Sequence, residues 1–546
     1  MSGIVYKMKN LISIGQTKNG ESEEIPPKNM TEVIQRLPEA FHKYMDEELP
    51  YRHASALAFI LIVLGMGAPL WYHTTKTYRA PFVFFPKDQA LPLRVQIHLA
   101  VTDENLEAQL DTTSYNLSLM LLEGDVKAPL NIKWEILYKG VRDLHFLENE
   151  RMKPSDTLAV YIAIVPIEQW PHFSAIPVFL GRGHWTFLQY SPELDKLTGR
   201  LRSLVWEVMV DVPHINEIVK RDLREKLEPW QIAALSPSHQ KRLVWDSVPL
   251  SMNYIVQIIH VHDNAYPNLT YSKEIMTVVE VFKRRLENIT RIQLSAEHLW
   301  DFEISNFFDI DVQGRSTVSQ QAAERLLKEI DSQLQSVESS YPVLKIVIIE
   351  AEVPVIMLDA FGEDSRGIAV ASWGAIIPRI YIGETTRKTE TAARVLAALR
   401  ILLGVDSELP LSWKRDPVPL ADWEIERMRI RAVVDNAMRA ISAINALKAL
   451  TEKISNVVIN DDVAARANQA VHLVQTGLEN PASPHLNLIA AGRFLADEAL
   501  SHPSLLSLLY FPKDQTLAVY LPIMLPTLIP LFGSIVALCK WILGWS

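Results

Sequence analysis

The stretch ASALAFILIVLGMGAPLWY, residues 54–72, contains no Asp, Glu, Lys, Arg or His. A helix of about 20 apolar residues is long enough to cross the hydrocarbon core of a bilayer. Trp71 and Tyr72 close the run, and aromatic rings of this kind favour the membrane–water interface. A secretory signal would begin near residue 1, whereas 53 residues precede this run. We therefore interpret residues 54–73 as a transmembrane helix.

A second run, residues 516–539, also lacks charged residues and histidine. A buried core helix is the alternative, but Tyr520 and Trp541 mark its ends in the way that interfacial residues do. Pro522, Pro526 and Pro530 recur at a spacing of four, which is tolerated in a membrane helix when neighbouring helices satisfy the freed carbonyl groups. Two spans place both ends of the chain on one side and the residues between them on the other. Basic residues flank the two runs too evenly to say which side is cytosolic.

The composition narrows the class of protein. The chain has 546 residues, of which 48% are hydrophobic, enough for one large domain or several. The net charge of −10 argues against a protein that binds nucleic acid, which would need a basic face. Cys539 is the only cysteine, so no internal disulfide forms, and cysteine content leaves the compartment open.

The region between the two runs alternates strand-like and helix-like patterns. Short apolar or alternating segments predict strands at 93–101, 157–166, 252–261, 343–352 and within 367–382. Apolar residues at helical spacing predict helices at 192–209, 273–289, 319–334 and 389–404. This alternation favours a three-layer α/β domain, which we assign to residues 74–420. The order of the strands is not readable from the sequence.

Residues 421–515 carry a different pattern. Helices are predicted at 421–455, 461–478 and 484–501, and this helical block leads directly into the second apolar run. We expect it to lie close to the membrane. Asn460, Asp461 and Asp462 precede or open the second of these helices, where they are expected to cap exposed backbone N–H groups and to complement the helix dipole.

The sequence offers little that indicates catalysis. G-x-S-x-G, H-E-x-x-H, P-loop and G-x-G-x-x-G motifs are all missing. Cys539 lies at the edge of an apolar run, where burial in lipid raises a thiol pKa, so it is a poor nucleophile. We therefore predict no catalytic, cofactor-binding or metal-binding residue and no cofactor.

Two short clusters leave an enzymatic alternative open. His260 and His262 would lie on one side of a strand, a geometry that metal sites use, although a strand end meeting solvent explains them too. Asp309 and Asp311 could hold a divalent cation, or could be a strand running into a turn. The alternative function is a membrane-tethered lumenal metal-dependent hydrolase or glycosyltransferase. Asn116, Asn268 and Asn288 begin N-x-[S/T] sequons and are candidates for N-glycosylation in a lumenal domain.

Four stretches resemble one family, the PIG-S subunits of glycosylphosphatidylinositol (GPI) transamidase. They are GAPLWYHTTKTYRAPF (67–82), LAALRILLGV (396–405), KISNVVINDDVAARANQAV (453–471) and PSLLSLLYFPKDQTLAVYLPIMLP (503–526). They fall in matching order over nearly the whole chain from about residue 54. Between about residues 90 and 340 the resemblance is mainly one of pattern.

The resemblance implies a fold class, a place and a function. The fold would be a membrane protein with two transmembrane helices, 54–73 and 516–539, flanking a large lumenal α/β domain plus the membrane-proximal helical block. Residues 1–53 and 540–546 would be cytosolic, and the membrane would be that of the endoplasmic reticulum. The function would be that of a non-catalytic subunit supporting attachment of GPI anchors to precursor proteins.

The resemblance also implies partners. They are PIG-K, which carries the catalytic cysteine and histidine, PIG-T, PIG-U and a metallopeptidase-like GPI-attachment subunit, together with membrane lipid and without nucleic acid. A nucleophile supplied by another chain agrees with the lack of one here.

Overall fold

A computed structural model describes residues 39–75, 78–85, 90–101, 130–140, 157–167, 176–220, 251–262, 270–311, 314–334, 341–351, 354–359, 361–370, 373–378, 384–405, 409–453, 458–506 and 513–543. The chain divides into two compact units. The terminal unit comprises residues 1–77 and 509–546, and the body comprises residues 78–508.

Two helical stretches form the terminal unit. The first consists of α3 (Glu39–Ile60), a π-helical turn η1 (Leu61–Gly67) and α4 (Ala68–Thr75), and the second is α18 (Lys513–Ile542). Within the described residues, Glu47–His73 and Ala518–Ile542 are the two segments long and apolar enough to cross a membrane. The prediction of an apolar helix near each end of the chain is therefore confirmed.

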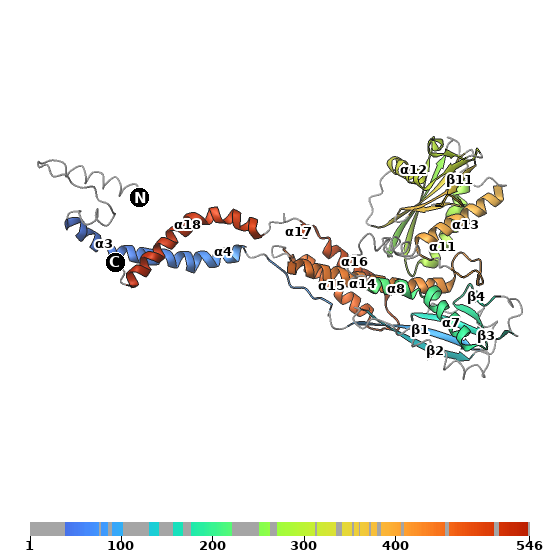
Figure 1. Cartoon of the computed structure of the whole chain (residues 1–546), viewed down its shortest axis with the longest axis horizontal. Coiled ribbons are helices and arrows are strands. Elements are labelled where there is room, and N and C mark those ends of the chain that lie inside the picture. The colour runs from blue at the N-terminus through green and yellow to red at the C-terminus, as the bar shows by residue number, and fades with distance from the viewer. Residues whose placement is uncertain are drawn as a thin grey trace. The chain divides into compact units, whose positions relative to one another are not determined.

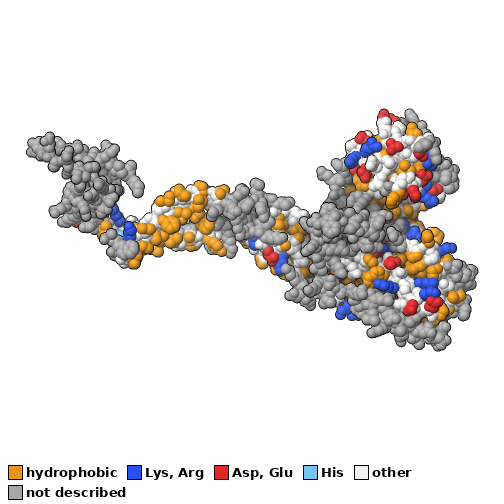
Figure 2. Space-filling model, in the orientation of Figure 1, with side chains coloured by type: hydrophobic (Ala, Val, Ile, Leu, Met, Phe, Trp, Pro, Cys, Tyr) orange, Lys and Arg blue, Asp and Glu red, His pale blue; other side chains and the backbone are white. Residues whose placement is uncertain are grey.

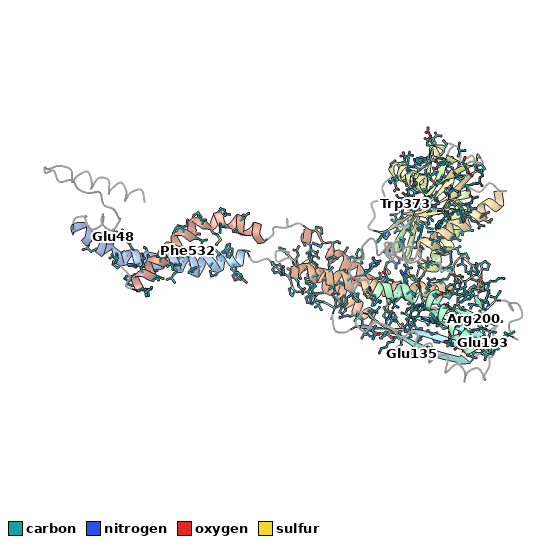
Figure 3. The ribbon with its side chains drawn as sticks, in the orientation of Figure 1. Glu48, Glu135, Glu193, Arg200, Trp373 and Phe532 are labelled. Carbon is teal, nitrogen blue, oxygen red and sulfur yellow. The ribbon has the colours of Figure 1, made fainter. Side chains whose placement is uncertain are left out.

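The two apolar helices pack side by side in opposite directions (Figure 1). The ring of His53, early in the first helix, lies 5.0 Å from Trp541 at the end of the second. Trp71, late in the first helix, lies 6.4 Å from Tyr520, early in the second. Figure 2 shows hydrophobic side chains along these helices, and Figure 3 labels one of them, Phe532, which is 66% exposed. An exposed apolar surface of this kind suits lipid or neighbouring helices.

The first sheet of the body has the strand order β15-β4-β5-β3-β1-β2. Its strands are β1 (Leu91–Val101), β2 (Leu130–Gly140), β3 (Ala159–Val165), β4 (Val178–Leu180), β5 (Trp185–Gln189) and β15 (Lys414–Arg415). All neighbouring strands are parallel except β4 and β5. After β5 the chain forms α7 (Leu194–Ser203), η3 (Leu204–Met209) and α8 (Val212–Lys220).

The second sheet has the order β13-β14-β10-β6-β7. Its strands are β6 (Asn253–His262), β7 (Arg291–Leu299), β10 (Val343–Glu350), β13 (Ile368–Val370) and β14 (Gly374–Pro378). The helices associated with it are α11 (Thr270–Leu286), α12 (Gln320–Gln333) and α13 (Glu384–Leu402). One face of the sheet shares a core with α11 and α13, and the other face shares a core with α12.

A small third sheet, in the order β12-β11-β9-β8, consists of β8 (Asp309–Ile310), β9 (Ser316–Val318), β11 (Val355–Leu358) and β12 (Asp364–Ser365). Its Val318, Val355 and Met357 belong to the same core as α12. It is formed by the connections that leave β7 and β10.

The two large sheets repeat one topology. In each, the second strand in the chain lies at the edge beside the first, and the third strand joins the first on its other side. The third strand then pairs in parallel with the fifth, and the fourth pairs antiparallel with the fifth. The sequence predicted the alternation of strands and helices in an α/β body, and the structure adds that this alternation belongs to two successive sheets of one topology.

The helical block follows the two sheets. It consists of α14 (Asp422–Lys453), α15 (Asp461–Gly477), α16 (Leu486–Leu500) and the short α17 (Pro503–Leu506). One continuous apolar core includes side chains from β1, β6, α11, α14 and α15. The three long helices are those expected from the sequence, but they share a core with the sheets and fall in the same compact unit.

Candidate functional site

His260 and His262 lie at the carboxyl end of β6, on the face that also carries Val256 and Ile258. The strand register places His298 of β7 beside His260, and Glu350 of β10 beside His262. Trp300 follows directly after β7. We call His260, His262, His298 and Trp300 the ring platform. The sequence showed the first two residues, whereas His298 and Trp300 come from the end of β7, whose pairing with β6 the sequence did not show.

The four rings of the platform are nearly parallel. His262 and Trp300 lie 4.5 Å apart at 13° between their planes, and His260 and His298 lie 4.8 Å apart at 10°. Nε2 of His262 lies 3.1 Å from Nδ1 of His298, a hydrogen-bond distance. One of these nitrogens must donate and the other accept, so at least one of the two imidazoles is neutral.

Burial favours the neutral form of two of the platform's histidines, His260 and His298. His260 is only 1% exposed, and its burial, together with the neighbouring His298 and His262, lowers its pKa to about 3. Burial also lowers the pKa of His298 below its ordinary value. The carboxyl group of Glu350 lies 4.0 Å from Nδ1 of His260. The site is therefore a set of stacked rings whose imidazole nitrogens can donate and accept hydrogen bonds, with a carboxyl group at one side.

One side of the ring platform, at His260 and His262, borders a special point of the sheet topology. The chain leaves β6 through α11 to reach β7 on one side, and it later returns through α12 to β10 on the other side. The connections therefore diverge between β6 and β10. In open α/β sheets, ligands bind outside the carboxyl ends of the strands at such a switch point.

Asp309 and Asp311 lie at a strand end and a turn, where each has contacts of its own. Among the residues that the structure describes, no group of three or more His, Cys, Asp or Glu side chains is arranged to hold a metal ion. Asp311 pairs with Arg315 at 2.9 Å, and its carbonyl oxygen accepts from the Gly314 amide in a tight turn where φ of Gly314 is 76°. Asp309 lies exposed in β8, and its carbonyl oxygen accepts from Thr317. The interpretation of Asp309 and Asp311 as a strand running into a turn fits this geometry.

The expected capping role of Asn460 was wrong. Asn460 is the residue before α15, but its side chain makes no capping hydrogen bond. Asp461 and Asp462 do lie in the first turn, where carboxylates suit the helix dipole. Their side chains point to other partners: Asp461 accepts from the Tyr78 hydroxyl at 2.6 Å, and Asp462 lies 3.2 Å from Nε2 of His502.

These four residues, Tyr78, Asp461, Asp462 and His502, form what we call the exit latch. Tyr78 follows the first apolar helix in the chain, and His502 precedes the second. Both chain segments therefore attach to the first turn of α15. The hydrogen bond to Asp461 raises the pKa of Tyr78, and Arg466, followed by His502, lowers the pKa of Asp462.

Backbone contacts extend the latch on the side of Tyr78. The Ala80 amide donates to the Ile459 carbonyl at 3.0 Å, and the Ile459 amide donates to the Tyr78 carbonyl at 3.2 Å. The Val83 amide donates to the side chain of Asn468 at 2.7 Å. These bonds fix the segment that follows the first apolar helix along α15.

The side of His502 brings together residue types known from hydrolases. Ser504 Oγ lies 2.8 Å from Nδ1 of His502, whose Nε2 contacts Asp462. The amide of Ser504 also donates to the same Nδ1, at 3.2 Å. This nitrogen is therefore an acceptor within a local turn, and Nε2 carries the proton that is donated to Asp462. The geometry favours an anchoring role over that of a general base.

The structure describes one of the three sequons. Asn288 is exposed in the turn after α11, and the hydroxyl of Thr290, the third residue of that sequon, donates to the Ser251 carbonyl at 2.8 Å. Asn116 and Asn268 lie outside the described residues. Cys539 is exposed on α18.

The fold and these sites define a class: a protein with an apolar helix near each end and a large α/β body that carries a duplicated sheet. Residues 58–544 match the family model described as Phosphatidylinositol-glycan biosynthesis class S protein, PIG-S. The chain belongs to the PIG-S family.

Curated relatives from three mammals align with this chain over almost their whole length. The chain is 27% identical over 537 residues to the GPI-anchor transamidase component PIGS of Rattus norvegicus, covering 90% of this chain and 95% of the relative. It is 27% identical over 540 residues to the protein of that name from Mus musculus, with the same shares covered. The Homo sapiens protein is 25% identical over 531 residues, covering 88% of this chain and 94% of the relative.

Proposed function

We propose that this chain is a component of the GPI transamidase complex that supports attachment of GPI anchors to precursor proteins. The observation that carries the proposal is the family match over residues 58–544, which includes most of both apolar helices and the whole body between them. The relatives are named as components of a transamidase, which makes this chain one subunit of an assembly.

We further propose that the subunit is not the catalytic one. In support, the described residues hold no metal cluster, and Asp309, Asp311 and Ser504 have local structural contacts. Cys539 lies within the second apolar helix, which is a poor setting for a thiolate nucleophile. The catalytic cysteine and histidine would come from PIG-K, with PIG-T, PIG-U and the metallopeptidase-like subunit as further partners.

The proposed setting is the endoplasmic reticulum membrane. Both apolar helices span it, residues 1–53 and 540–546 are cytosolic, and the α/β body and helical block are lumenal. The exposed apolar surface of Glu47–His73 and Ala518–Ile542 supports membrane insertion. The exposed position of Asn288 makes this sequon accessible to a lumenal oligosaccharyltransferase.

The test is purification of the tagged full-length chain from membranes in mild detergent, with mass spectrometry of what accompanies it. We expect a Cys/His protease-like subunit and polytopic partners in near-equal amounts. Recovery of the chain alone would contradict the proposal. In cells lacking the endogenous subunit, the double variant Asp309→Ala/Asp311→Ala should still restore surface GPI-anchored proteins. Complete loss with normal assembly would favour an enzyme instead.

Sidedness has its own test. Glycosidase treatment should increase the gel mobility of the wild-type chain, and Asn288→Gln should remove one step of that shift. Replacing Thr290 by Ser keeps the sequon and serves as the control. If all sequons stay unmodified while a cysteine placed at residue 288 reacts with a membrane-impermeant maleimide added to the cytosolic side, the lumenal assignment is wrong.

A further inference from the structure

The duplicated sheet provides an internal comparison for the ring platform. Val95, Gln96 and Ile97 of β1 correspond to Val256, Gln257 and Ile258 of β6, because both triplets occupy the first strand of their sheet. The registers agree with this alignment. Ile97 pairs with Val160 of β3, and Ile258 pairs with Ile346 of β10, and all four side chains belong to the large core.

Following the same registers along the strands gives the counterparts of the polar residues. His260 corresponds to Leu99, His262 to Val101, and Glu350 to Ile164. These three counterparts are all buried and apolar. The fold itself therefore does not require a polar residue at any of these positions.

Polar residues at such buried positions reduce the free energy of unfolding. Moving a polar group out of water is unfavourable unless its hydrogen bonds are replaced, whereas a buried Leu, Val or Ile gains free energy. The second sheet nevertheless has two histidines and a glutamate where the first has Leu99, Val101 and Ile164. Selection for a function rather than for stability explains this difference between the two copies.

The platform also reaches the surface. Trp300 is 40% exposed, while the ring of His262 lies parallel to it at 4.5 Å. The series of parallel rings thus ends in an indole with accessible surface. Asp301, the next residue, is exposed and has φ of 51°, a left-handed conformation that is uncommon outside glycine and that concentrates at functional sites.

We propose that the ring platform binds a sugar ring of a glycan, which stacks on the exposed indole of Trp300. The C–H face of a pyranose is apolar and slightly positive, which suits the negative face of an aromatic ring. Its hydroxyl groups both donate and accept hydrogen bonds, so imidazole nitrogens and the carboxyl groups of Glu350 and Asp301 are fitting partners. A glycan as ligand class rests in part on the proposed function, since the family is named for a phosphatidylinositol-glycan. The site itself rests only on the geometry.

The experiment is saturation-transfer difference NMR on the purified full-length chain in detergent. One probe is the glycan headgroup of a phosphatidylinositol-glycan released from its lipid, and a second is a free high-mannose N-glycan. Choline is a third probe, because a cage of aromatic rings beside carboxyl groups could instead bind a cation. Titration of each probe gives its Kd.

Three variants locate the binding. Trp300→Ala should weaken glycan binding at least tenfold, whereas Trp300→Phe, which keeps an aromatic face, should retain most of it. Phe361→Ala is the matched control, because Phe361 is an exposed aromatic residue at a tight turn elsewhere in the body. It should bind as the wild type does. Thermal melting of each variant shows whether the body remains folded.

The outcomes separate the sources of the glycan from the existence of the site. Binding of the phosphatidylinositol-glycan headgroup that depends on Trp300 supports the proposal and links it to the anchor. Binding of the N-glycan alone supports the platform as a glycan site for glycoproteins. Binding of neither glycan, binding of choline alone, or binding unaffected by Trp300→Ala would overturn it. None of these results depends on the presence of the other transamidase subunits. The proposed function is tested separately, by the co-purification experiment.

Discussion

The hydroxyl of Tyr78 donates a 2.6 Å hydrogen bond to Asp461, 383 positions further along the chain. The neighbouring Asp462 contacts His502 from the opposite end of the body sequence. Two adjacent carboxylates in one helical turn thus hold both segments that connect the body to the apolar helices. The segment after the first apolar helix and the segment before the second are therefore both held at the first turn of α15.

Breaking this bond should loosen the segment that follows the first apolar helix without unfolding the body. In Asp461→Ala the Tyr78 hydroxyl loses its acceptor, so we expect the Ala80 and Val83 amides, which donate to the Ile459 carbonyl and to the Asn468 side chain, to exchange with solvent several-fold faster. Hydrogen exchange read by mass spectrometry on the full-length protein measures this. Asp195→Ala is the control, since Asp195 is also an acidic residue in the first turn of a helix, α7. Equal protection in Asp461→Ala and wild type would show that the Tyr78–Asp461 bond does not hold this segment.

His260 should make the body less stable in acid. Its pKa is about 3 in the folded state and 6.5 when exposed, so it is neutral in both states above pH 6.5 and contributes no pH dependence there. Below pH 6.5 the unfolded chain gains a proton that the folded chain does not. At pH 5 this should lower the free energy of unfolding by about 2 kcal/mol.

Replacing His260 by Leu, the residue at the equivalent position 99, should remove this dependence. We expect the melting temperatures of His260→Leu and wild type to diverge progressively as the pH falls from 6.5 toward 3, with the variant the more stable. His73→Leu, which changes a histidine of the terminal unit, is the control. Parallel curves for His260→Leu and wild type would contradict the low pKa.

Glu426 and Glu424 of α14 should respond in opposite ways to loss of charge. Burial raises the pKa of Glu426 from 4.5 to about 7. The positive charge of Arg429 acts in the opposite direction, and the negative charge of Asp422 adds to the rise. Stability contributed by the protonated form is fully present below pH 4.5 and is lost as the pH rises through 7. Glu426→Gln should therefore raise the free energy of unfolding at pH 8, by up to about 3 kcal/mol, and change little at pH 4.

Glu424 lies two positions earlier but is paired. It accepts from both terminal nitrogens of Arg400, at 2.6 and 3.0 Å, and both residues are buried. Removing its charge leaves Arg400 buried without compensation, so Glu424→Gln should destabilise the body by about 3–5 kcal/mol. Denaturant titration of both variants at pH 8 makes the comparison. Destabilisation by Glu426→Gln at that pH would contradict the raised pKa.

The contact between α15 and α16 should not tolerate a larger residue at Gly492. A Cβ there would lie 2.7 Å from Val474 Cγ2 and 2.9 Å from the Ala470 carbonyl oxygen. Gly492→Ala must push the helices apart, at a cost of about 1–3 kcal/mol in the free energy of unfolding. Gly199→Ala in α7, where a Cβ meets nothing within 4 Å, should be neutral or stabilising. Thermal melting distinguishes the two, and equal effects would refute the packing argument.

Much of the local structure was predictable because periodicity is local. The helix expected at 421–455 is α14 (Asp422–Lys453), and the strand expected at 252–261 is β6 (Asn253–His262). By contrast, β2 (Leu130–Gly140) was not assigned, although Ile132, Trp134 and Ile136 alternate with Lys133 and Glu135 as they do in a half-buried strand. The shared Val-Gln-Ile of β1 and β6 was the one visible trace of the duplication, and a triplet is too short to stand out.

The sites were predictable only in part because pairing between strands is not encoded locally. Alternation along a strand places His260 and His262 on one face, as expected. Their neighbours His298, Trp300 and Glu350 come from β7 and β10, whose order beside β6 depends on the tertiary fold. In the same way, the sequence around Asp461 indicated helix capping, because the contact with Tyr78 joins residues that are far apart in the chain.

One feature of the first sheet has a consequence during synthesis. Its edge strand β15, at Lys414–Arg415, pairs with Phe179 and Leu180 of β4, which are translated more than 200 residues earlier. At about 5–20 residues per second, the β4 edge stays open for about 10–50 s after it emerges. The second copy of the sheet is made within that interval and presents strands of the same topology. An open edge beside a near-duplicate partner invites wrong pairing and aggregation, so this protein should depend on chaperones most strongly between the translation of β4 and that of β15.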